Sequence, residues 1–169
     1  MTINVELNEA SIDNAIKQIQ QYKKDLTEKT YRLVDEVASK VKTNAVHDLS
    51  QHIETGETIT SVRIEHQNNS YTASVLAGGA AIWLEFGTGV VANPVGVGGY
   101  AHPKAAELGM SGIGTYGNGH GADINGWWYY DEFGRRRHTF GIPATCFMYY
   151  SAMNARREIP NLARRIYRT

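Results

Sequence analysis

Cysteine and long apolar runs are scarce in this sequence, and each scarcity excludes a class of protein. Cys146 is the single cysteine among 169 residues, so no internal disulfide can form and a reducing compartment is expected. No apolar run approaches the ~18 residues that a membrane-spanning helix needs. The first residues have neither a basic nor an apolar stretch, so we expect no signal peptide. The composition predicts a protein that is made in a cytosol and has no membrane partner.

Net charge is also zero, but the charges are unevenly placed along the chain. Residues 1–134 contain 9 Lys and Arg against 16 Asp and Glu, whereas residues 135–169 contain 8 Arg against a single acid. Arg suits bidentate pairing with carboxylates or phosphates. Arg164 and Arg165 are therefore candidate contacts for an acidic partner. The simpler interpretation is that they complement the C-terminal end of a solvated helix.

Glycine and proline are both missing from residues 11–50, and apolar residues recur there at steps of three, four and seven. This spacing predicts one amphipathic helix over 11–50. Such a helix would be about 60 Å long, which exceeds the dimensions of a compact chain of this size. We expect it either to bend near Lys24–Thr27 or to project and pack on another subunit. Its apolar stripe consists of Ile12, Ile16, Ile19, Leu26, Leu33, Val34, Val37, Val41, Ala45, Val46 and Leu49.

A period of two replaces the helical period within residues 58–86, which we expect to form sheet. Apolar and polar residues alternate on both sides of the turn Asn68-Asn69-Ser70, which predicts a β-hairpin. The apolar run 81–86 predicts a further strand, with Glu85 on the face opposite Leu84. We expect Glu85 to accept hydrogen bonds from loop N–H groups or to pair with an Arg across a subunit boundary. An exposed carboxylate at a sheet edge is the plainer alternative.

Glycine is concentrated in one stretch, with 14 of the 17 glycines in residues 87–141. Glycine loses much backbone entropy on folding and buries no side chain, so 87–126 predicts a long loop. An aromatic hairpin is expected over 127–140, followed by a helix over 144–168 that Pro160 kinks or ends. The prediction is one α+β domain with an antiparallel sheet of about five strands.

The histidines offer one alternative function, a metal-dependent hydrolase. His102, His120, Asp123 and His138 are of the residue types that bind zinc. Their spacing matches no ligand pattern, and scattered polar histidines are the plainer interpretation. We therefore assign no catalytic, cofactor-binding or metal-binding residue.

The basic stretch next to the aromatic strand offers a second alternative, a nucleic-acid-binding module. Arg135 and Arg137 would lie on one face of a strand beside the aromatic residues 127–130. A hairpin that packs its aromatic residues on a helix explains the same pattern. Nucleic acid is thus not expected as a specific ligand, and Arg135 and Arg137 are candidate contacts with a protein partner.

Three short segments carry a family resemblance through their residues and their order. Thr55–Val62 is similar to the pattern Thr-Gly-x-Leu-x-x-Ser-Ile, with Thr in place of Leu. Trp83–Gly89 resembles Tyr-x-x-Glu-Phe-Gly-Thr. Trp127–Glu132 and Gly141–Tyr149 resemble an aromatic hairpin followed by Gly-Ile-Pro-Ala-x-Pro-Phe-Met, with Cys146 in place of the second Pro. These segments look like those of the siphophage neck and tail-component proteins, which join heads to tails.

The resemblance implies a structural virion subunit of a tailed bacteriophage or prophage, at the head–tail neck or in a tail-completion ring. It implies no enzymatic activity and no cofactor. The expected partners are neighbouring neck and tail proteins, with copies of the chain forming a homo-oligomeric ring. The protein would be synthesised in the bacterial host cytoplasm and carried in the virion. Within the second segment, Glu85, Gly87 and Thr88 are candidate subunit or partner contacts.

Overall fold

The fold, seen in a computed structural model, is mixed helix and sheet, which confirms the predicted composition. The structure describes residues 3–51, 59–66, 71–78, 81–88, 102–104, 107, 125–131, 133–142 and 144–168. The Gly-rich stretch predicted as a loop lies mostly outside these ranges. No helix in the described ranges is long and apolar enough to cross a membrane. The elements are α1 (Glu9–Ser50), β1 (Arg63–His66), β2 (Ala73–Leu76), α3 (Ala81–Phe86), β3 (Trp127–Tyr130), β4 (Arg136–Thr139), β5 (Gly141–Ile142) and α5 (Phe147–Arg168).

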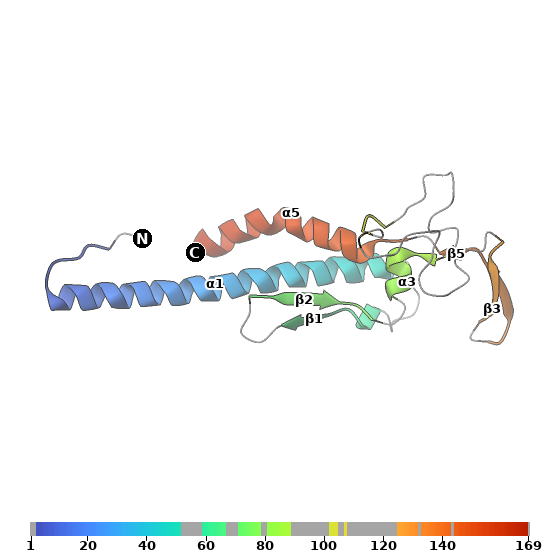
Figure 1. Ribbon diagram of the computed structural model, residues 1–169, viewed down its shortest axis with the longest axis horizontal. Coiled ribbons are helices and arrows are strands. Elements are labelled where there is room, and N and C mark those ends of the chain that lie inside the picture. The colour runs from blue at the N-terminus through green and yellow to red at the C-terminus, as the bar shows by residue number, and fades with distance from the viewer. Residues whose placement is uncertain are drawn as a thin grey trace.

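The long N-terminal helix α1 is a single unbroken element of 42 residues. Asn8 caps it, because its side-chain oxygen accepts a hydrogen bond from Ser11 N at 2.8 Å. The hydroxyl of Ser11 in turn accepts one from Glu6 N at 2.9 Å. At 1.5 Å per residue the helix is about 63 Å long. It is straight, without the predicted bend near Lys24–Thr27, and its N-terminal part projects beyond the other helices and strands (Figure 1). Packing of this part on another subunit stays a prediction.

The C-terminal helix α5 packs antiparallel along the second half of α1 (Figure 1). Small buried residues, Ala45 on α1 and Ser151 and Ala155 on α5, allow the two helices to approach closely. Pro160 lies inside α5 and does not end it, contrary to one of the two expectations, although the helix curves in Figure 1. The buried stripe continues beyond the proline with Ile166, and this packing holds the last turns against α1.

The hydrophobic core is small and lies where the end of α1 meets β1–β2, α3 and the start of α5. Its largest fully buried side chains are Leu49, Val62 and Phe147, joined by Ala45 and Ala81. Partly buried residues packed against them are Val46, Ile59, Val75, Ala77, Leu84 and Met148. Four separate segments of the chain therefore meet at one end of α1.

The predicted five-stranded sheet is wrong, because four of the described strands form two separate antiparallel pairs and β5 makes an isolated bridge with Thr88. β1 pairs with β2, with Ile64 opposite Val75, and this hairpin lies along α1. β3 pairs with β4 at the far end of the molecule, with Trp128 opposite His138. The run Ala81–Phe86, predicted as a strand, is the short helix α3. A helix places residues four apart on the same face, and α3 buries Ala81 and Glu85 in this way.

Candidate assembly surfaces

The N-terminal half of α1, residues 9–29, is an arm that extends beyond the other described elements (Figure 1). The cover that α5 gives α1 ends in the turn after the arm, where Tyr167 of α5 shares a 2.8 Å hydrogen bond with Thr30. On the other side, Tyr71, which precedes β2, stacks on Tyr31 with ring centroids 4.7 Å apart. The arm thus begins where the coverage by α5 and the β1–β2 hairpin ends.

The arm exposes an apolar stripe. Every large apolar side chain on it is more than 40% exposed, up to 55% for Ile19. Single exposed apolar residues are ordinary, but a contiguous row of them marks an interaction surface. Glu9 and Asp13 border the stripe on one side, and neither has an ion pair among the described residues. The stripe consists of Ile12, Ile16, Ile19, Tyr22 and Leu26.

Glu85 occupies a buried position between α3 and the first turn of α5. Its carboxylate accepts hydrogen bonds from the backbone N–H groups of Met148 and Tyr149, at 2.8 and 3.0 Å. Only 7% of the residue is exposed. The first N–H groups of a helix lack intrahelical partners, so Glu85 supplies the cap of α5 from a distant part of the sequence. The expectation of an exposed carboxylate at a sheet edge is wrong. Glu85 does accept hydrogen bonds from backbone N–H groups, but these groups belong to α5 and not to the loop.

His102 completes this buried node. Its Nε2 lies 2.8 Å from Glu85 Oε1, and its Nδ1 accepts a hydrogen bond from Lys104 N at 3.0 Å. Because Nδ1 is the acceptor, the ring proton is on Nε2 and is donated to the carboxylate. The ring also contacts Phe86 and Tyr149, with centroid distances of 4.3 and 5.4 Å. His102 is therefore held as a structural side chain.

The residues that follow Glu85 make further contacts with the segment before α5. Gly87 has φ 72°, a conformation that favours glycine. Thr88 forms an antiparallel bridge with Ile142, whose N–H donates to the Thr88 hydroxyl at 3.2 Å. Of the predicted partner contacts Glu85, Gly87 and Thr88, the structure places Glu85 and Thr88 against the chain's own C-terminal part.

Cys146 precedes α5 in an unusual backbone conformation, with φ 53°. Its N–H donates to the backbone oxygen of Glu85 at 3.1 Å. Burial, and next the charge of Glu85, raise the pKa of the Cys146 thiol from 9.0 to about 11. A proline cannot adopt a positive φ, so the backbone conformation at Cys146 excludes a proline at this position.

The tip of the β3–β4 hairpin is closed by Asp131. Its carboxylate accepts hydrogen bonds from the backbone N–H groups of Phe133 and Arg135, and pairs with the guanidinium groups of Arg135 and Arg137 at 2.9 and 3.2 Å. The Arg135 N–H and these guanidinium groups hold the pKa of Asp131 below its ordinary value. The structure thus brings the predicted pair Arg135 and Arg137 together, but on an internal carboxylate.

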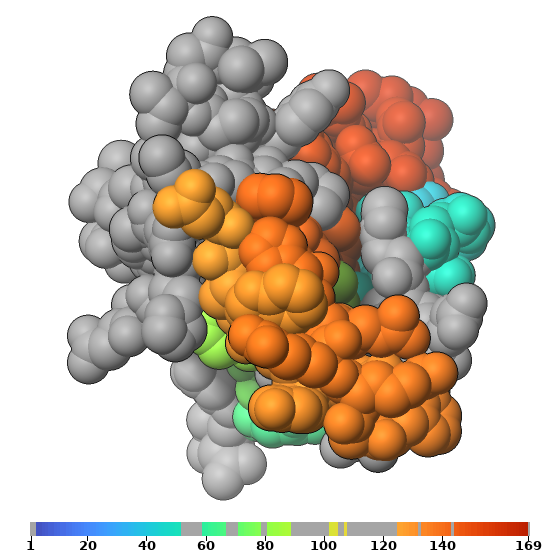
Figure 2. All heavy atoms as spheres, turned by 90° about the vertical axis from the view of Figure 1, so that its right-hand side faces the viewer, coloured from blue at the N-terminus to red at the C-terminus, as the bar shows by residue number. Residues whose placement is uncertain are grey.

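The opposite face of this hairpin carries exposed aromatic residues and the guanidinium group of Arg136. Arg136 lies over the ring of Trp128, 4.4 Å from its centroid. Among the described residues it has no ion pair. Tyr130 is 73% exposed. We define the hairpin face as Trp128, Tyr130, Arg136 and His138, which the strand register places side by side. Figure 2 shows this hairpin standing out at the end of the molecule.

The two C-terminal arginines predicted as partner contacts have partners within the chain. Arg165 pairs with Glu36 of α1, which also accepts a hydrogen bond from Arg32. Arg164 donates to the side chain of Asn161 at 3.3 Å. Hydrogen bonds from Arg32 foremost, and then from Arg165, hold the pKa of Glu36 below its ordinary value. A role of Arg164 and Arg165 between subunits stays a prediction.

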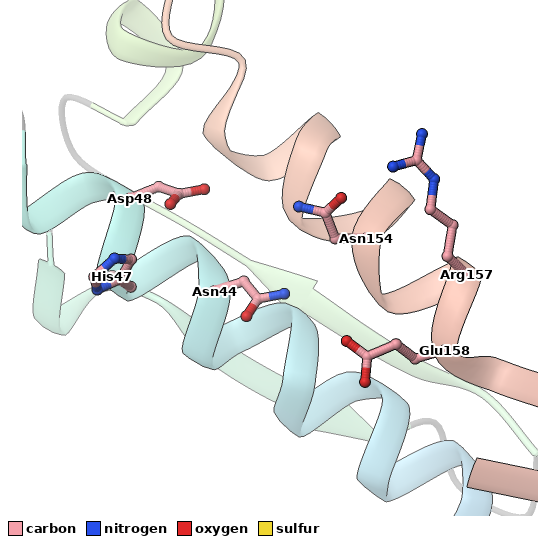
Figure 3. A pocket seen from close by; sticks show the side chains of 6 residues that line it. All are labelled: Asn44, His47, Asp48, Asn154, Arg157 and Glu158. Carbon is pink, nitrogen blue, oxygen red and sulfur yellow. The ribbon is translucent and has the colours of Figure 1, made fainter. Parts of the chain in front are cut away.

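A polar groove of about 440 Å³ lies between α1 and α5. Figure 3 shows Asn44 and Asn154 on the facing helices, with Arg157 directed away from α1. The two carboxylates already have partners: Glu158 pairs with Lys40, and Asp48 lies 3.5 Å from the Ser151 hydroxyl. The groove is lined by Asn44, His47, Asp48, Asn154, Arg157 and Glu158.

The residues considered as metal ligands are not gathered in the described structure. His138 lies on the hairpin, where its ring nitrogen contacts Asn125 O at 2.9 Å, while His102 belongs to the buried node. His120 and Asp123 lie outside the described residues. Across the ranges that the structure describes, no group of three His, Cys, Asp or Glu could hold a metal ion.

Comparisons with known proteins identify no relative of the chain. Its sequence matches no protein-family profile and no curated protein, and its fold matches no solved structure.

Proposed function

We propose that this protein is a structural subunit of a tailed-bacteriophage particle, acting at the head–tail neck or in the tail-completion ring. It works by binding its neighbours. The observation that carries the proposal is the arm: about 30 Å of helix that exposes Ile12, Ile16 and Ile19 and extends beyond the other described helices and strands. An apolar helix face that stays exposed among the described residues suits a subunit whose packing is completed by other subunits.

Two of the segments behind the phage resemblance, Trp83–Gly89 and Gly141–Tyr149, are in contact, which supports reading them as one structural signature. Leu84 O accepts hydrogen bonds from both the N–H and the hydroxyl of Thr145, at 2.8 and 2.9 Å. Glu85 caps α5, and Thr88 bridges Ile142. Residues about sixty positions apart in the sequence therefore depend on one another. Matching segments that build one local structure carry more weight than short matches scattered over a fold.

The proposed partners are neighbouring neck and tail proteins together with further copies of this chain in a ring. The elongated form of the subunit supports this arrangement, because the arm and the β3–β4 hairpin lie at opposite ends (Figure 1). Two exposed surfaces at opposite ends let one subunit contact two neighbours at once. The proposal involves no cofactor and places the mature protein in the virion, after synthesis in the host cytoplasm.

An arm variant tests the proposal in the phage or prophage that carries the gene. Ile16→Glu with Ile19→Glu puts charges on the stripe, and because both side chains are exposed in the subunit, we expect the subunit to fold normally. Particles should then accumulate as separate heads and tails. Asn14→Glu is the matched control, since Asn14 lies on the other side of the helix. Normal infectious particles from the double variant would contradict the proposal.

A further inference from the structure

The arm and the hairpin face have complementary chemistry. The arm presents a stripe of isoleucine side chains bordered by the carboxylates of Glu9 and Asp13. The hairpin face presents two aromatic rings, Trp128 and Tyr130, beside the guanidinium of Arg136. Trp, Tyr and Arg are the residues most enriched at the energetic centres of protein interfaces. The aromatic rings and the guanidinium of the hairpin face thus suit the apolar stripe and the carboxylates of the arm.

Arg136 differs from its neighbours in having no acidic partner among the residues that the structure describes. Asp131 pairs with both Arg135 and Arg137, whereas Arg136 is stacked on Trp128 and has no ion pair within the described chain. The arm has the converse arrangement, because Glu9 and Asp13 have no basic partner there. Unpaired charges of opposite sign, each beside exposed apolar groups, favour a contact between these two surfaces.

These surfaces cannot meet within one subunit, because α1, about 63 Å long, holds them at opposite ends of the molecule (Figure 1). We propose that the arm of one copy docks on the hairpin face of the next copy, with Ile12 and Ile16 against Trp128 and Tyr130, and the acidic border against Arg136. This inference rests on the proposed function as an assembly subunit. It names a second copy of this chain as the partner of both surfaces.

Pairing between two arms is the main competing arrangement. With Ile12, Ile19 and Leu26 on the seam of such a pair, Ala15 and Tyr22 take the other seam positions and Lys23 lies beside the seam. The apolar stripe is thus compatible with both arrangements, which the hairpin variant measured alone distinguishes. A four-residue strand spans only about 13 Å, so a hairpin covers the first turns of the arm and leaves Lys23 in water.

The contact is heterologous, because each copy uses a different surface toward each neighbour. Such contacts close into rings or continue as filaments. A patch this short buries less surface than a stable dimer, so a single contact is weak. Closure of a ring, in which every subunit makes two contacts, then supplies the stability of the assembly.

Two variants of the purified full-length chain test the proposal. The arm variant carries Ile12→Ser and Ile16→Ser, and the hairpin variant carries Trp128→Ser and Arg136→Glu. Sedimentation velocity is measured for each alone and for an equimolar mixture, up to about 1 mM, where weak contacts are populated. Arg156→Glu, which alters an exposed arginine on α5, is the control. Circular dichroism verifies that each variant is folded.

We expect the wild type and the Arg156→Glu control to form oligomers, and each variant alone to stay monomeric. The mixture should stop at a dimer, because the intact hairpin of one variant binds the intact arm of the other. Self-association of the hairpin variant alone would show arm–arm pairing and overturn the proposal. A monomeric wild type would also overturn it. This holds equally if the hairpin of that monomer binds single-stranded oligonucleotide instead. Neither result bears on the proposed function, which is tested separately by the arm variant in the phage or prophage.

A charge exchange tests the electrostatic part of the contact. Arg136→Glu should weaken association with a wild-type arm by about tenfold. Pairing Arg136→Glu with an arm that carries Glu9→Lys and Asp13→Lys should restore most of this loss. If the exchanged pair binds as weakly as either single partner, the carboxylates of the arm do not contact Arg136, and the assignment of this partner is wrong.

Discussion

Glu85 Oε1 and His102 Nε2 share a buried hydrogen bond of 2.8 Å, and the same carboxylate caps the helix that begins 62 residues after it. The bond joins α3, the segment at His102 and α5 through one side chain. The start of α5 is therefore held from outside, since Cys146, with φ 53°, does not have the extended conformation of an ordinary capping residue. The position of α5 on α1 depends on this node.

Glu85→Gln should destabilise the fold. A glutamine keeps one acceptor oxygen but turns an NH₂ group toward donors that now lack a partner, a loss of about 1–3 kcal/mol in the free energy of unfolding. Denaturant titration followed by circular dichroism measures it. Glu65→Gln is the matched control, because Glu65 is exposed on β1 and, among the described residues, forms an ion pair with Arg63 alone. Equal denaturation midpoints for the two variants would mean that the cap contributes little.

Cys146→Pro should be among the most damaging single substitutions at the start of α5. A proline has φ near −65° and no N–H, so it can adopt neither the φ of 53° nor the hydrogen bond to Glu85 O. We expect a loss of about 3 kcal/mol or more in unfolding free energy. Cys146→Gly, which tolerates the positive φ but leaves the space of the buried thiol empty, is the control and should lose clearly less stability than the proline variant. A stable proline variant would show that this backbone geometry is not required.

The Cys146 thiol should be unreactive in the folded protein. Burial and the charge of Glu85 raise its pKa to about 11, so almost no thiolate, the reactive form, exists at neutral pH. Because the folded pKa lies above the ordinary 9.0, this group's contribution to stability is complete below pH 9 and is lost as the pH rises toward 11. Iodoacetamide labelling and unfolding titrations across this range, with Cys146→Ala as reference, measure both effects. Rapid labelling of native protein would contradict this environment.

Gly126→Ala should loosen the base of the β3–β4 hairpin. A Cβ atom at Gly126 would lie 2.2 Å from Thr139 O, and the residue also has φ +71°. Gly134, in the turn, has the same φ but nothing within 4 Å of a Cβ atom, so Gly134→Ala isolates the backbone strain. Amide hydrogen exchange of β3 and β4 should speed up more in Gly126→Ala than in Gly134→Ala. Equal exchange in both would remove the steric explanation.

Charge reversal of Arg164 and Arg165 to Glu should leave the thermal midpoint nearly unchanged, because exposed ion pairs are screened by solvent. Arg165 contacts Glu36, but Arg32 remains beside that carboxylate. If these arginines also contact a neighbouring subunit, the double variant should fold normally and still block the joining of heads to tails. A variant that both melts and assembles like the wild type would confine these residues to their contacts within the chain.

The helices could be predicted from the sequence because their signal is periodic and long. Residues 11–50 repeat one apolar face over many turns, and the structure adds only Glu9 and Ala10 to that helix. The six-residue run Ala81–Phe86 was assigned to the wrong element, because an apolar run this short does not distinguish a strand from a helix. The error about Glu85 followed from it, since a strand would have turned the carboxylate away from the core.

The hydrogen-bond and ion-pair partners of the candidate site residues could not be predicted from the sequence. Glu85 and Met148, or Glu36 and Arg165, meet only through the packing of α5 on other elements, and no local spacing encodes such distant pairs. One signal for Glu85 was present. A carboxylate inside an apolar run needs buried donors, and the N–H groups at the start of the predicted C-terminal helix were available to supply them.

The most direct test of the proposed function is an electron-microscopic count of joined particles after disruption of the gene. The gene is interrupted in the lysogen or phage that encodes it, lysis is induced, and the wild-type gene is supplied from a plasmid as control. We predict that heads and tails accumulate unjoined, and that the plasmid restores complete particles containing this protein. Joined, infectious particles in the absence of the protein, or no particles even from the intact strain, would contradict the account.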